Sequence, residues 1–370
     1  MQGRTVSLLL HCFDQGGSGR VAAYLARGLH RSGLTVDLTV FARGGPAEGV
    51  ATEIIGDELP IHYFGDYSGS RPVDLIRSLP AVAHHLRSVQ PAAVIACANN
   101  VALVGAAAVR MAGLGTSKFF LKTTNPIASS RHKGAIRSIR RWSYRFVFTR
   151  SNAVWTLSPE ESAEMRQAFP AFAGQFRDVA NPYVTPLMLA LPRAERTPGT
   201  SKTIIAVARL TPQKRLDRLI NAFAKVKTPG VRLVILGEGE ERASLAAVIA
   251  SLGLAGRVSM PGFVRDVATE LHSADLFVLT SAYEGLPAVV LEAMAANCPV
   301  LSTDCFPAAG ALVGNAQGCA IIPDGDDADA LALQIDRQLE WPRPTKLRPI
   351  AERYSIANGI LSHIAAMQLE

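Results

Sequence analysis

The sequence lacks the cysteine patterns, the long hydrophobic runs and the leader that would place the protein outside the cytoplasm. Its 5 cysteines are odd in number and include no C-x-x-C pair, which argues against a disulfide framework and a zinc ribbon and favours a reducing compartment. The longest apolar stretches, such as Val101 to Val109, meet a charge well short of the ~18 residues needed to span a bilayer. The first apolar run, which ends at Leu10, is too short for a secretory signal. We therefore expect a cytoplasmic protein.

Apolar residues, in contrast, are plentiful enough for large buried cores. Hydrophobic residues make up 48% of the chain and charged residues 19%, which excludes a disordered protein. A chain of 370 residues is also more than one core usually holds. Apolar runs of strand length alternate with helical patterns in both halves, which is typical of parallel sheets covered on both faces. The strands are expected at Thr5–Leu10, Thr35–Phe41, Ala93–Cys97, Lys118–Lys122, Ala153–Leu157, Thr203–Ala208, Val231–Leu236, Asp275–Leu279 and Pro299–Ser302.

This alternation predicts a doubly wound α/β protein with two Rossmann-like domains that face each other across a cleft. Prolines interrupt any regular element between Asn181 and Thr200, so we place the domains at residues 1–185 and 186–370. The amphipathic segment after about Pro349 is expected to form a helix, which is a candidate for crossing back to the first domain.

The formal net charge of +7 is concentrated in the first half. Residues 1–185 carry 20 Lys and Arg against 12 Asp and Glu, and no acidic residue stands between positions 131 and 150. Such a basic field suits nucleic acid, anionic lipid or a phosphorylated ligand, and charge alone leaves all three open.

An amphipathic helix is predicted inside the basic segment, because Ile136, Ile139, Trp142 and Phe146 recur at helical spacing. Its apolar stripe could pack on its own domain or lie on a membrane. A tryptophan beside arginines suits an interfacial helix, so we favour the membrane. The residues assigned to that contact are Arg137, Arg140, Arg141, Trp142 and Arg145.

A glycine-rich loop follows the first expected strand. The glycines from Gly16 to Gly19 let a backbone approach a phosphate closely. Gly17 to Ala22 also fits the dinucleotide fingerprint G-x-G-x-x-A, although Asp37 stands at the beginning of the second strand rather than at its end. An NADP-dependent oxidoreductase and a turn that only tightens the strand–helix joint are therefore alternatives.

Two cations follow the first strand of the second half. Arg209 and Lys214 are five residues apart at a strand's carboxyl end, where an Arg fork and a Lys point charge can converge on one polyanion. Taken alone, the pair is better explained as a solvated helix start.

Two glutamates flank the start of a later helix. Pro287 is suited to the first helical position, so Glu284 is expected in the loop and Glu292 about one and a half turns into the helix. Carboxylates at different depths suit hydroxyl groups on separate sugar rings. A pair of surface glutamates is the alternative, but it explains poorly why Glu292 stands among apolar residues.

Together these motifs resemble the nucleotide-sugar-binding half of retaining glycosyltransferases of the GT-B fold, in the large family numbered four. The N-terminal glycine loop resembles the same family, so the resemblance covers nearly the whole chain. The matching segments are Ala208–Leu210 with Lys214, Leu236–Gly239, Pro261–Val264, Glu284 to Glu292 as E-x(7)-E, Gly16-Gly17 and Asn181-Pro182.

The resemblance implies a role for each matching position. Arg209 and Lys214 would hold the donor diphosphate, Glu284 the transferred sugar and Glu292 the ribose. Such enzymes need no metal ion or cofactor. The remaining donor contacts would come from Gly16, Gly17, Gly262, Phe263, Val264, Gly285, Leu286 and Pro287.

Three features of the chain depart from the family pattern or need their own interpretation. The histidine that many relatives carry near the sugar is missing from residues 120–126, where Lys122 or Asn125 could contact the sugar or the acceptor. His11 is expected to be a hydrogen-bonded core histidine. The Asp324-Gly325-Asp326 run matches the D-x-D of metal-dependent transferases, but we expect a loop and helix cap there.

The resulting prediction is a retaining, metal-independent glycosyltransferase. It would move a sugar from a nucleotide-diphosphate sugar, with UDP ahead of GDP, to a glycan acceptor. We expect a lipid-linked saccharide of bacterial surface polysaccharide or lipopolysaccharide synthesis, at the inner face of the cytoplasmic membrane. No nucleic-acid partner is expected. The alternatives are the NADP-dependent oxidoreductase and a non-catalytic sugar-nucleotide-binding protein.

Overall fold

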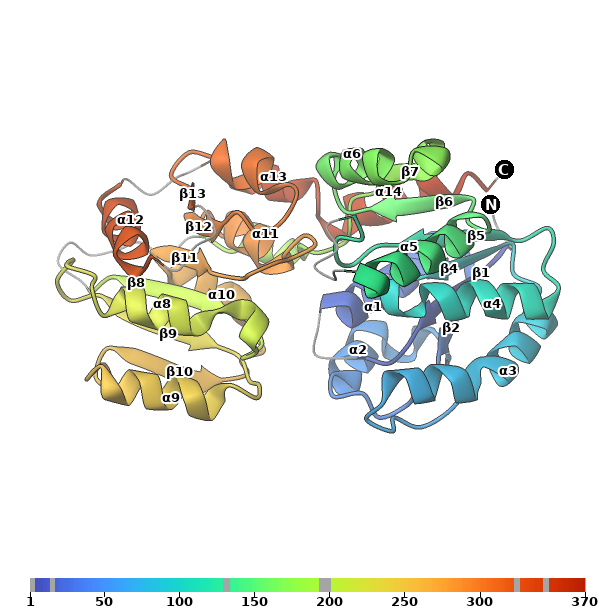
Figure 1. The fold of residues 1–370 in the computed structure, drawn as a ribbon, viewed down its shortest axis with the longest axis horizontal. Coiled ribbons are helices and arrows are strands. Elements are labelled where there is room, and N and C mark those ends of the chain that lie inside the picture. The colour runs from blue at the N-terminus through green and yellow to red at the C-terminus, as the bar shows by residue number, and fades with distance from the viewer. Residues whose placement is uncertain are drawn as a thin grey trace. The chain divides into compact units, whose positions relative to one another are not determined.

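The structure is a computed structural model that describes residues 4–13, 17–128, 134–192, 201–322, 327–341 and 346–369, with the backbone alone for residues 134–137 (Figure 1). The chain divides into two compact units. Unit 1 comprises Met1–Pro182 and Ile356–Glu370, and unit 2 comprises Tyr183–Ser355. The units therefore part three residues before the predicted boundary, and residues 356–370 belong to unit 1.

Unit 1 is built on a seven-stranded parallel sheet of order β3-β2-β1-β4-β5-β6-β7. Alternate residues of β1 face opposite layers: Leu8 packs with α1, α2 and α14, whereas Leu9 packs with α3, α4, α5 and α6. The strands are β1 Thr5–Leu10, β2 Thr35–Val40, β3 Ile61–Tyr63, β4 Ala93–Ala96, β5 Lys118–Lys122, β6 Ala153–Thr156 and β7 Phe176–Asp178. The helices are α1 Gly17–Arg31, α2 Glu48–Ile55, α3 Arg71–Val89, α4 Ala102–Ala112, α5 Gly134–Phe148, α6 Pro159–Ala168 and α14 Ile356–Met367.

The last helix, α14, completes the core of unit 1. Ile360 is buried among residues of β1, α1 and α2. The helix packs directly on the Asn181-Pro182 turn, because a Cβ on Gly359 would lie 2.5 Å from the backbone nitrogen of Pro182. Only glycine allows this approach. The close packing holds α14 against the segment where the chain leaves unit 1.

Unit 2 is built on a six-stranded parallel sheet of order β10-β9-β8-β11-β12-β13. Buried residues of α8, α9 and α12 cover one face of it, and α10 and α11 also contact its strands. The strands are β8 Thr203–Val207, β9 Arg232–Leu236, β10 Val258–Gly262, β11 Leu276–Leu279, β12 Val300–Thr303 and β13 Ala320–Ile322. The helices are α7 Pro186–Ala190, α8 Leu216–Phe223, α9 Arg242–Ser251, α10 Val267–Ser273, α11 Ala288–Ala295, α12 Ala328–Glu340 and α13 Arg348–Glu352.

The predicted doubly wound α/β architecture is confirmed. In each sheet the strand order reverses once, between β1 and β4 in unit 1 and between β8 and β11 in unit 2. Open α/β sheets bind ligands outside the carboxyl ends of the strands at such a reversal. In the described part of the chain, no helix has both the length and the apolar composition needed to cross a bilayer.

Candidate active site

The loops after β8 and β11 meet at the reversal of the unit 2 sheet. The backbone N–H of Ala282 donates to the carbonyl of Gln213 at 2.8 Å, and the Gln213 side-chain amide donates to the carbonyl of Tyr283 at 2.8 Å. The Thr280 hydroxyl contacts the carbonyl oxygens of Lys214 and Arg215 at 3.0 Å each. The structure thus brings together the two loops in which the predicted cations and Glu284 stand.

A close ion pair joins the two loops. Lys214 Nζ lies 2.5 Å from Glu284 Oε1, and the two side chains are only 16% and 11% exposed. The backbone N–H of Glu284 donates to the carbonyl of Cys305 at 2.7 Å, which ties this loop to the end of β12 as well. The sequence suggested separate ligands for these two residues, whereas the structure shows each as the other's partner.

Arg209 stands in the same loop after β8 but is exposed. Among the described residues its guanidinium has no hydrogen bond or ion pair, in contrast to the ammonium of Lys214. An exposed guanidinium keeps all five of its donors for a bound anion. The predicted cation pair therefore consists of one half-buried and one exposed member.

Glu292 is buried within α11, with 3% of its surface exposed, as its apolar neighbours predicted. The loop of Gly285, Leu286 and Pro287 that leads into this helix is buried too. The helix begins at Ala288, so Pro287 precedes the first turn instead of opening it. The prediction for Pro287 was one residue early, and the N–H groups of the first turn start at Ala288.

Two glycines let the loops after β8 and β9 pack backbone to backbone. A Cβ on Gly237 would lie 1.9 Å from the carbonyl oxygen of Ala208, and a Cβ on Gly239 would lie 2.3 Å from that of Leu210. The N–H of Leu210 donates to the carbonyl of Glu238 at 2.9 Å. These contacts hold the backbone on both sides of Arg209.

The loop after β10 joins this set. The N–H of Gly237 donates to the carbonyl of Gly262 at 2.8 Å, and Gly262 has a left-handed φ of 95° that glycine adopts without cost. Phe263 next to it is exposed and Val264 is half-buried. An exposed aromatic ring at a strand's carboxyl end offers a surface for stacking on a planar ligand.

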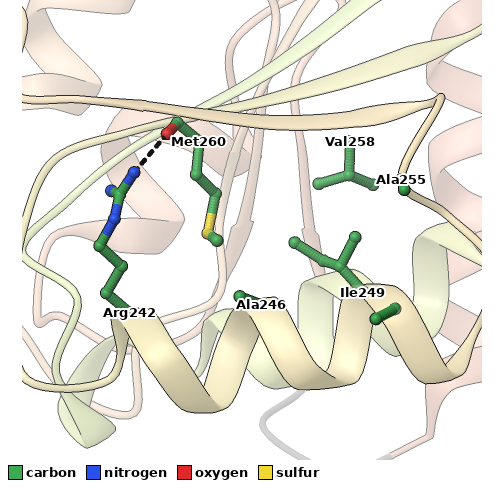
Figure 2. A pocket seen from close by; sticks show the side chains of 7 residues that line it. Arg242, Ala246, Ile249, Ala255, Val258 and Met260 are labelled. Atoms are coloured by element: carbon green, nitrogen blue, oxygen red, sulfur yellow. Dashed lines mark hydrogen bonds between the residues drawn. The ribbon is translucent and has the colours of Figure 1, made fainter.

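A shallow pocket of about 320 Å³ lies between α9 and β10 (Figure 2). Its lining is mostly apolar and includes Ile249, Val258 and Met260. Arg242 lies at its edge and donates to the carbonyl of Met260 at 2.8 Å. None of the predicted site residues lines this pocket, so it takes no part in the candidate site.

In unit 1 the predicted residues are more scattered. Gly16 lies outside the described residues, and Gly17 opens α1 with nothing within 4 Å of an added Cβ. The loop of Asn125 after β5 is held by Asn99, whose side-chain amide donates to the Asn125 carbonyl at 2.8 Å. Asn125 itself is exposed. Lys122, by contrast, is buried at the end of β5.

Lys122 belongs to a buried polar group that the sequence did not reveal. Burial lowers the pKa of Lys122 to about 8, against the opposing effect of the Cys97 thiol and the Glu161 carboxylate. Burial likewise raises the pKa of Glu161 to about 7, although hydrogen bonds from the Leu157 N–H and the Thr123 hydroxyl oppose the shift. His363 of α14 stays neutral, since burial and the Lys122 charge lower its pKa to about 3. Glu161 is the residue that sequence reasoning missed, because its position in α6 resembles an ordinary helix start.

His11 is the hydrogen-bonded core histidine that was expected. It is 3% exposed, and its Nε2 lies 3.0 Å from Asp74 Oδ2. The Asp324-Gly325-Asp326 run lies outside the described residues. Asp327, directly after it, caps α12 by accepting from the N–H groups of Asp329 and Ala330.

Some residues of the basic helix α5 are buried and others are exposed. Val147 and Phe148 are buried in unit 1, whereas Ile139 and Trp142 are 66% and 70% exposed. Ile139 and Trp142 therefore do not pack on their own domain. The alternative that the apolar stripe of this helix packs there is wrong for these two residues.

The arginines of α5 likewise differ in their contacts and exposure. Arg141 donates to the carbonyl of Ala168 at 2.7 Å and lies over the Phe169 ring at 5.3 Å. It anchors the helix to the end of α6, which disfavours the predicted membrane contact for this residue. Arg140 is half-buried and Arg145 is exposed. The side chain of Arg137 lies outside the described residues.

Comparison with known proteins accounts for both units. Residues 190–355 match the family described as glycosyl transferases group 1, and residues 16–182 match the glycosyl transferase 4-like domain. The lipopolysaccharide core biosynthesis glycosyltransferase LpsE of Rhizobium meliloti is 36% identical over 130 residues, which are 35% of this chain and 38% of the relative.

A second relative and a solved structure extend the comparison. An N-acetylgalactosaminyltransferase of Campylobacter jejuni, named for a diphospho-undecaprenol acceptor, is 33% identical over 137 residues, 37% of this chain and 34% of that protein. The chain spans less than half the length of either relative. The crystal structure of Anabaena Alr3699/HepE in complex with UDP-glucose has the same fold, with a TM-score of 0.77, 22% identity and 98% of each chain covered.

Two parallel α/β units with these family matches define a GT-B protein. The chain belongs to the group 1 glycosyltransferases.

The buried Glu161 predicts a pH dependence of stability. Its pKa is higher in the folded chain, about 7, than the ~4.3 of an exposed glutamate. The folded chain therefore binds the Glu161 proton more tightly than the unfolded chain does. As the pH rises from about 4.5 through 7 this proton is lost, and the free energy of unfolding falls. Glu161→Gln should remove this fall and gain about 1–3 kcal/mol at pH 8 relative to wild type, with no gain at pH 4.

Urea unfolding of both proteins across this pH range measures the difference. Glu160→Gln is the matched control, because Glu160 is the neighbouring carboxylate on the same helix but is less buried. A difference between wild type and Glu161→Gln that does not vary with pH would contradict the assignment.

Proposed function

We propose that this chain is a retaining glycosyltransferase that moves a sugar from a nucleotide-diphosphate sugar to a glycan acceptor. The observation that carries the proposal is the Lys214–Glu284 pair at the reversal of the unit 2 sheet, with exposed Arg209 in the same loop. A half-buried ammonium and an exposed guanidinium at a strand's carboxyl end suit the two phosphates of a donor. Family membership supports this chemistry.

In the proposed reaction the bond between the sugar C1 and the diphosphate oxygen breaks, and a bond from C1 to an acceptor oxygen forms on the same face. The acceptor's proton passes to the leaving diphosphate. Lys214, Arg209 and the first N–H groups of α11 stabilise the charge that develops on that group, so this chain's own residues supply the stabilisation. Glu284, which already holds Lys214, presents its carboxylate to the hydroxyl groups of the transferred sugar.

The remaining donor contacts follow from the positions of the loops. Glu292 would bind the ribose hydroxyls, and Phe263 beside Gly262 would meet the base. UDP is the nucleotide we favour over GDP, because the HepE structure of the same fold holds UDP-glucose.

A lipid-linked or lipopolysaccharide acceptor is supported by the names of the relatives LpsE and the Campylobacter transferase. Lys122 and Asn125 stay candidates for acceptor contacts. A screen of UDP- and GDP-sugars with lipid-linked acceptors, read by mass spectrometry, tests both assignments, and turnover with GDP-sugars alone would reject UDP.

The dinucleotide-binding alternative gains no ribose ligand from Asp37. Its carboxylate is 6% exposed and accepts hydrogen bonds from Ser7 and Thr39 inside the sheet, so it does not face a ribose at a strand end. A protein that only binds sugar nucleotides would have the same site. Turnover of a nucleotide sugar distinguishes that alternative from an enzyme.

The phosphate contacts predict large losses of activity. Arg209→Ala and Lys214→Ala should each lower kcat/KM by about 100-fold or more, because both cations stabilise the leaving diphosphate. Lys225→Ala is the matched control, since Lys225 forms an exposed pair with Asp329 at 2.7 Å in the same unit. Transfer should continue in EDTA. Full activity in either site variant, or loss of transfer in EDTA, would show that the leaving-group chemistry is wrong.

The two glutamates predict different defects. Glu292→Gln should weaken the binding of free UDP, because its proposed partner is the ribose. Glu284→Gln should leave UDP affinity unchanged or raise it, since Lys214 loses its carboxylate partner, and should lower kcat through the lost sugar contact. Isothermal titration calorimetry with UDP and steady-state kinetics separate the two roles. Equal losses of UDP affinity in both variants would reject the division.

The exposed face of α5 is the proposed membrane contact. Ile139, Trp142 and Arg145 are exposed on it, and each cation near an anionic surface contributes on the order of 1 kcal/mol at low salt. The double variant Trp142→Ala with Arg145→Gln should lose most binding to vesicles that contain anionic lipid, while its thermal stability stays unchanged.

Co-sedimentation at low and high salt measures that binding. Trp341→Ala is the matched control, because Trp341 is an exposed tryptophan of unit 2. If wild type never sediments with the vesicles, the arginines are better explained as a contact for a phosphorylated acceptor. If the double variant sediments as wild type does, α5 is not the membrane contact.

A further inference from the structure

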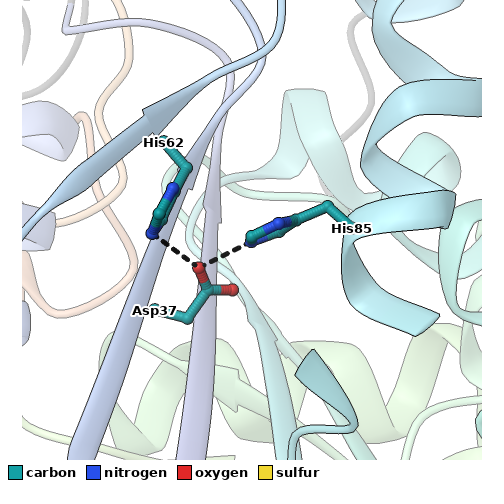
Figure 3. Close-up of side chains that lie close together, drawn as sticks. All are labelled: Asp37, His62 and His85. Carbon is teal, nitrogen blue, oxygen red and sulfur yellow. Dashed lines mark hydrogen bonds and ion pairs between the residues drawn. The ribbon is translucent and has the colours of Figure 1, made fainter. Parts of the chain in front are cut away.

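Three side chains with metal-binding atoms converge in unit 1. None of them is a residue assigned to the donor site. They are Asp37 of β2, His62 of β3 and His85 of α3, and one potential ligand atom from each lies within 4.8 Å of the others (Figure 3). His85 Nε2 is 2.8 Å from Asp37 Oδ1, and His62 Nε2 is 3.8 Å from the same oxygen.

The parallel register of the strands explains why these residues meet. Thr39 of β2 is paired with His62 of β3, and Asp37 is two residues before Thr39, so all three project from the same face of the sheet. Leu38 faces the opposite layer, among the residues of α1 and α2. Helix α3 covers the face that holds Asp37, and it brings His85 over the carboxylate (Figure 3).

Two hydroxyl groups orient the Asp37 carboxylate. Ser7 Oγ donates to Asp37 Oδ2 at 2.6 Å, and Thr39 Oγ1 donates to the same oxygen at 3.1 Å. With Oδ2 occupied, Oδ1 is the oxygen that faces both histidines. Partners of this kind hold metal ligands in place and raise affinity for the ion.

The spacing and the exposure of the ligands suit an ion of the size of zinc. Tetrahedral ligands about 2.0 Å from Zn²⁺ lie about 3.3 Å from one another, between the 2.8 Å and 3.8 Å of the two Asp37–histidine pairs. The three atoms as a set lie within 4.8 Å of one another, so the two imidazoles must draw closer together when the ion binds. The side chain of His62 is 42% exposed and that of His85 is 18% exposed. An ion can therefore enter from solvent, and water can supply a fourth ligand.

We propose that Asp37 Oδ1, His62 Nε2 and His85 Nε2 form a binding site for a divalent transition-metal ion, with Zn²⁺ the favoured occupant. Two imidazoles and one carboxylate suit zinc and its neighbours, whereas Mg²⁺ and Ca²⁺ prefer oxygen ligands. The ion takes the place of the Asp37–His85 hydrogen bond. It joins the edge strand β3, its neighbour β2 and helix α3, so its role is to stabilise this side of unit 1 and not to take part in sugar transfer.

Metal titration of the chain without a polyhistidine tag tests the site. Calorimetry should show one equivalent of Zn²⁺ bound with a matching rise in Tm, and neither effect with Mg²⁺. Co²⁺ should give the visible absorption of a four- or five-coordinate ion. His62→Gln and His85→Gln should remove the Co²⁺ absorption and the Zn²⁺-dependent rise in Tm.

Two further variants sharpen the result. His84→Gln is the matched control, because His84 is the exposed neighbour of His85 on α3, and it should bind zinc as wild type does. Thr39→Val removes one hydroxyl from Asp37 without changing the size of the side chain, and should weaken zinc binding about 10–100-fold. Circular dichroism of each metal-free variant checks that it is folded.

The proposal is overturned if folded wild type takes up no zinc, or if His62→Gln binds zinc as tightly as wild type. The second outcome would place the ion on other ligands and leave Asp37 and His85 as a plain hydrogen-bonded pair. Transfer activity below the melting temperature should be the same with zinc and after chelation, which separates this site from the donor site.

Discussion

In each unit one central strand pairs with neighbours on both sides. The strands that follow it in the sequence are first added on one side of it, and the later strands are then added on the other side. In unit 2 that strand is β8, which pairs with β9 and with β11. The loops that follow β8 and β11 therefore start from adjacent strand ends and contact each other, and a ligand is expected outside these ends. The pairing of Lys214 with Glu284 depends on this reversal, whereas the close approach of Gly237 and Gly239 to the β8 loop depends on the pairing of β8 with β9. A sheet wound in one direction only would place β9 and β10 between β8 and β11 and would keep the loops of Lys214 and Glu284 apart.

The Lys214–Glu284 pair resolves an electrostatic problem that the reversal creates. A cation meant for a diphosphate must be partly shielded from water to act strongly, yet a shielded cation without a partner is costly. Glu284 supplies the partner when no anion is bound. Because the same carboxylate is proposed to contact the sugar, a bare phosphate meets a lysine that is already neutralised, whereas a complete nucleotide sugar offers hydroxyl groups to Glu284 as well. The pair would thus favour the whole donor over its fragments.

The strands that could be predicted from the sequence are those whose residues show a clear pattern within one short segment. The inner strands, such as β1 and β5, are apolar on both faces, and their predicted bounds agree with the structure to within about a residue. The four strands that went unrecognised, β3, β7, β10 and β13, are the outermost strands of the two sheets. Of these, β3, β7 and β13 have three residues each and β10 has five. An edge strand needs no long apolar run because one side of it is solvated.

The same distinction holds for the polar residues. Arg209, Lys214 and Glu284 stand in recognisable motifs, so their loops were identified, but the ion pair between Lys214 and Glu284 depends on strand order and was not. Asp37 and His85 are 48 residues apart in the sequence, and Glu161 is 38 residues from Thr123, which donates a hydrogen bond to it. No spacing rule in the sequence brings such residues together, because only sheet register and helix packing do.

Unit 2 is an insertion in unit 1, since residues 183–355 separate α14 from the rest of its core. The ribosome therefore completes every residue of unit 2 before it reaches Ile356. Until then the surface of α1 and the sheet that receives Ile360 and Met367 stays without its cover. Unit 2 can fold while the chain is still being made, but unit 1 must wait for its last helix.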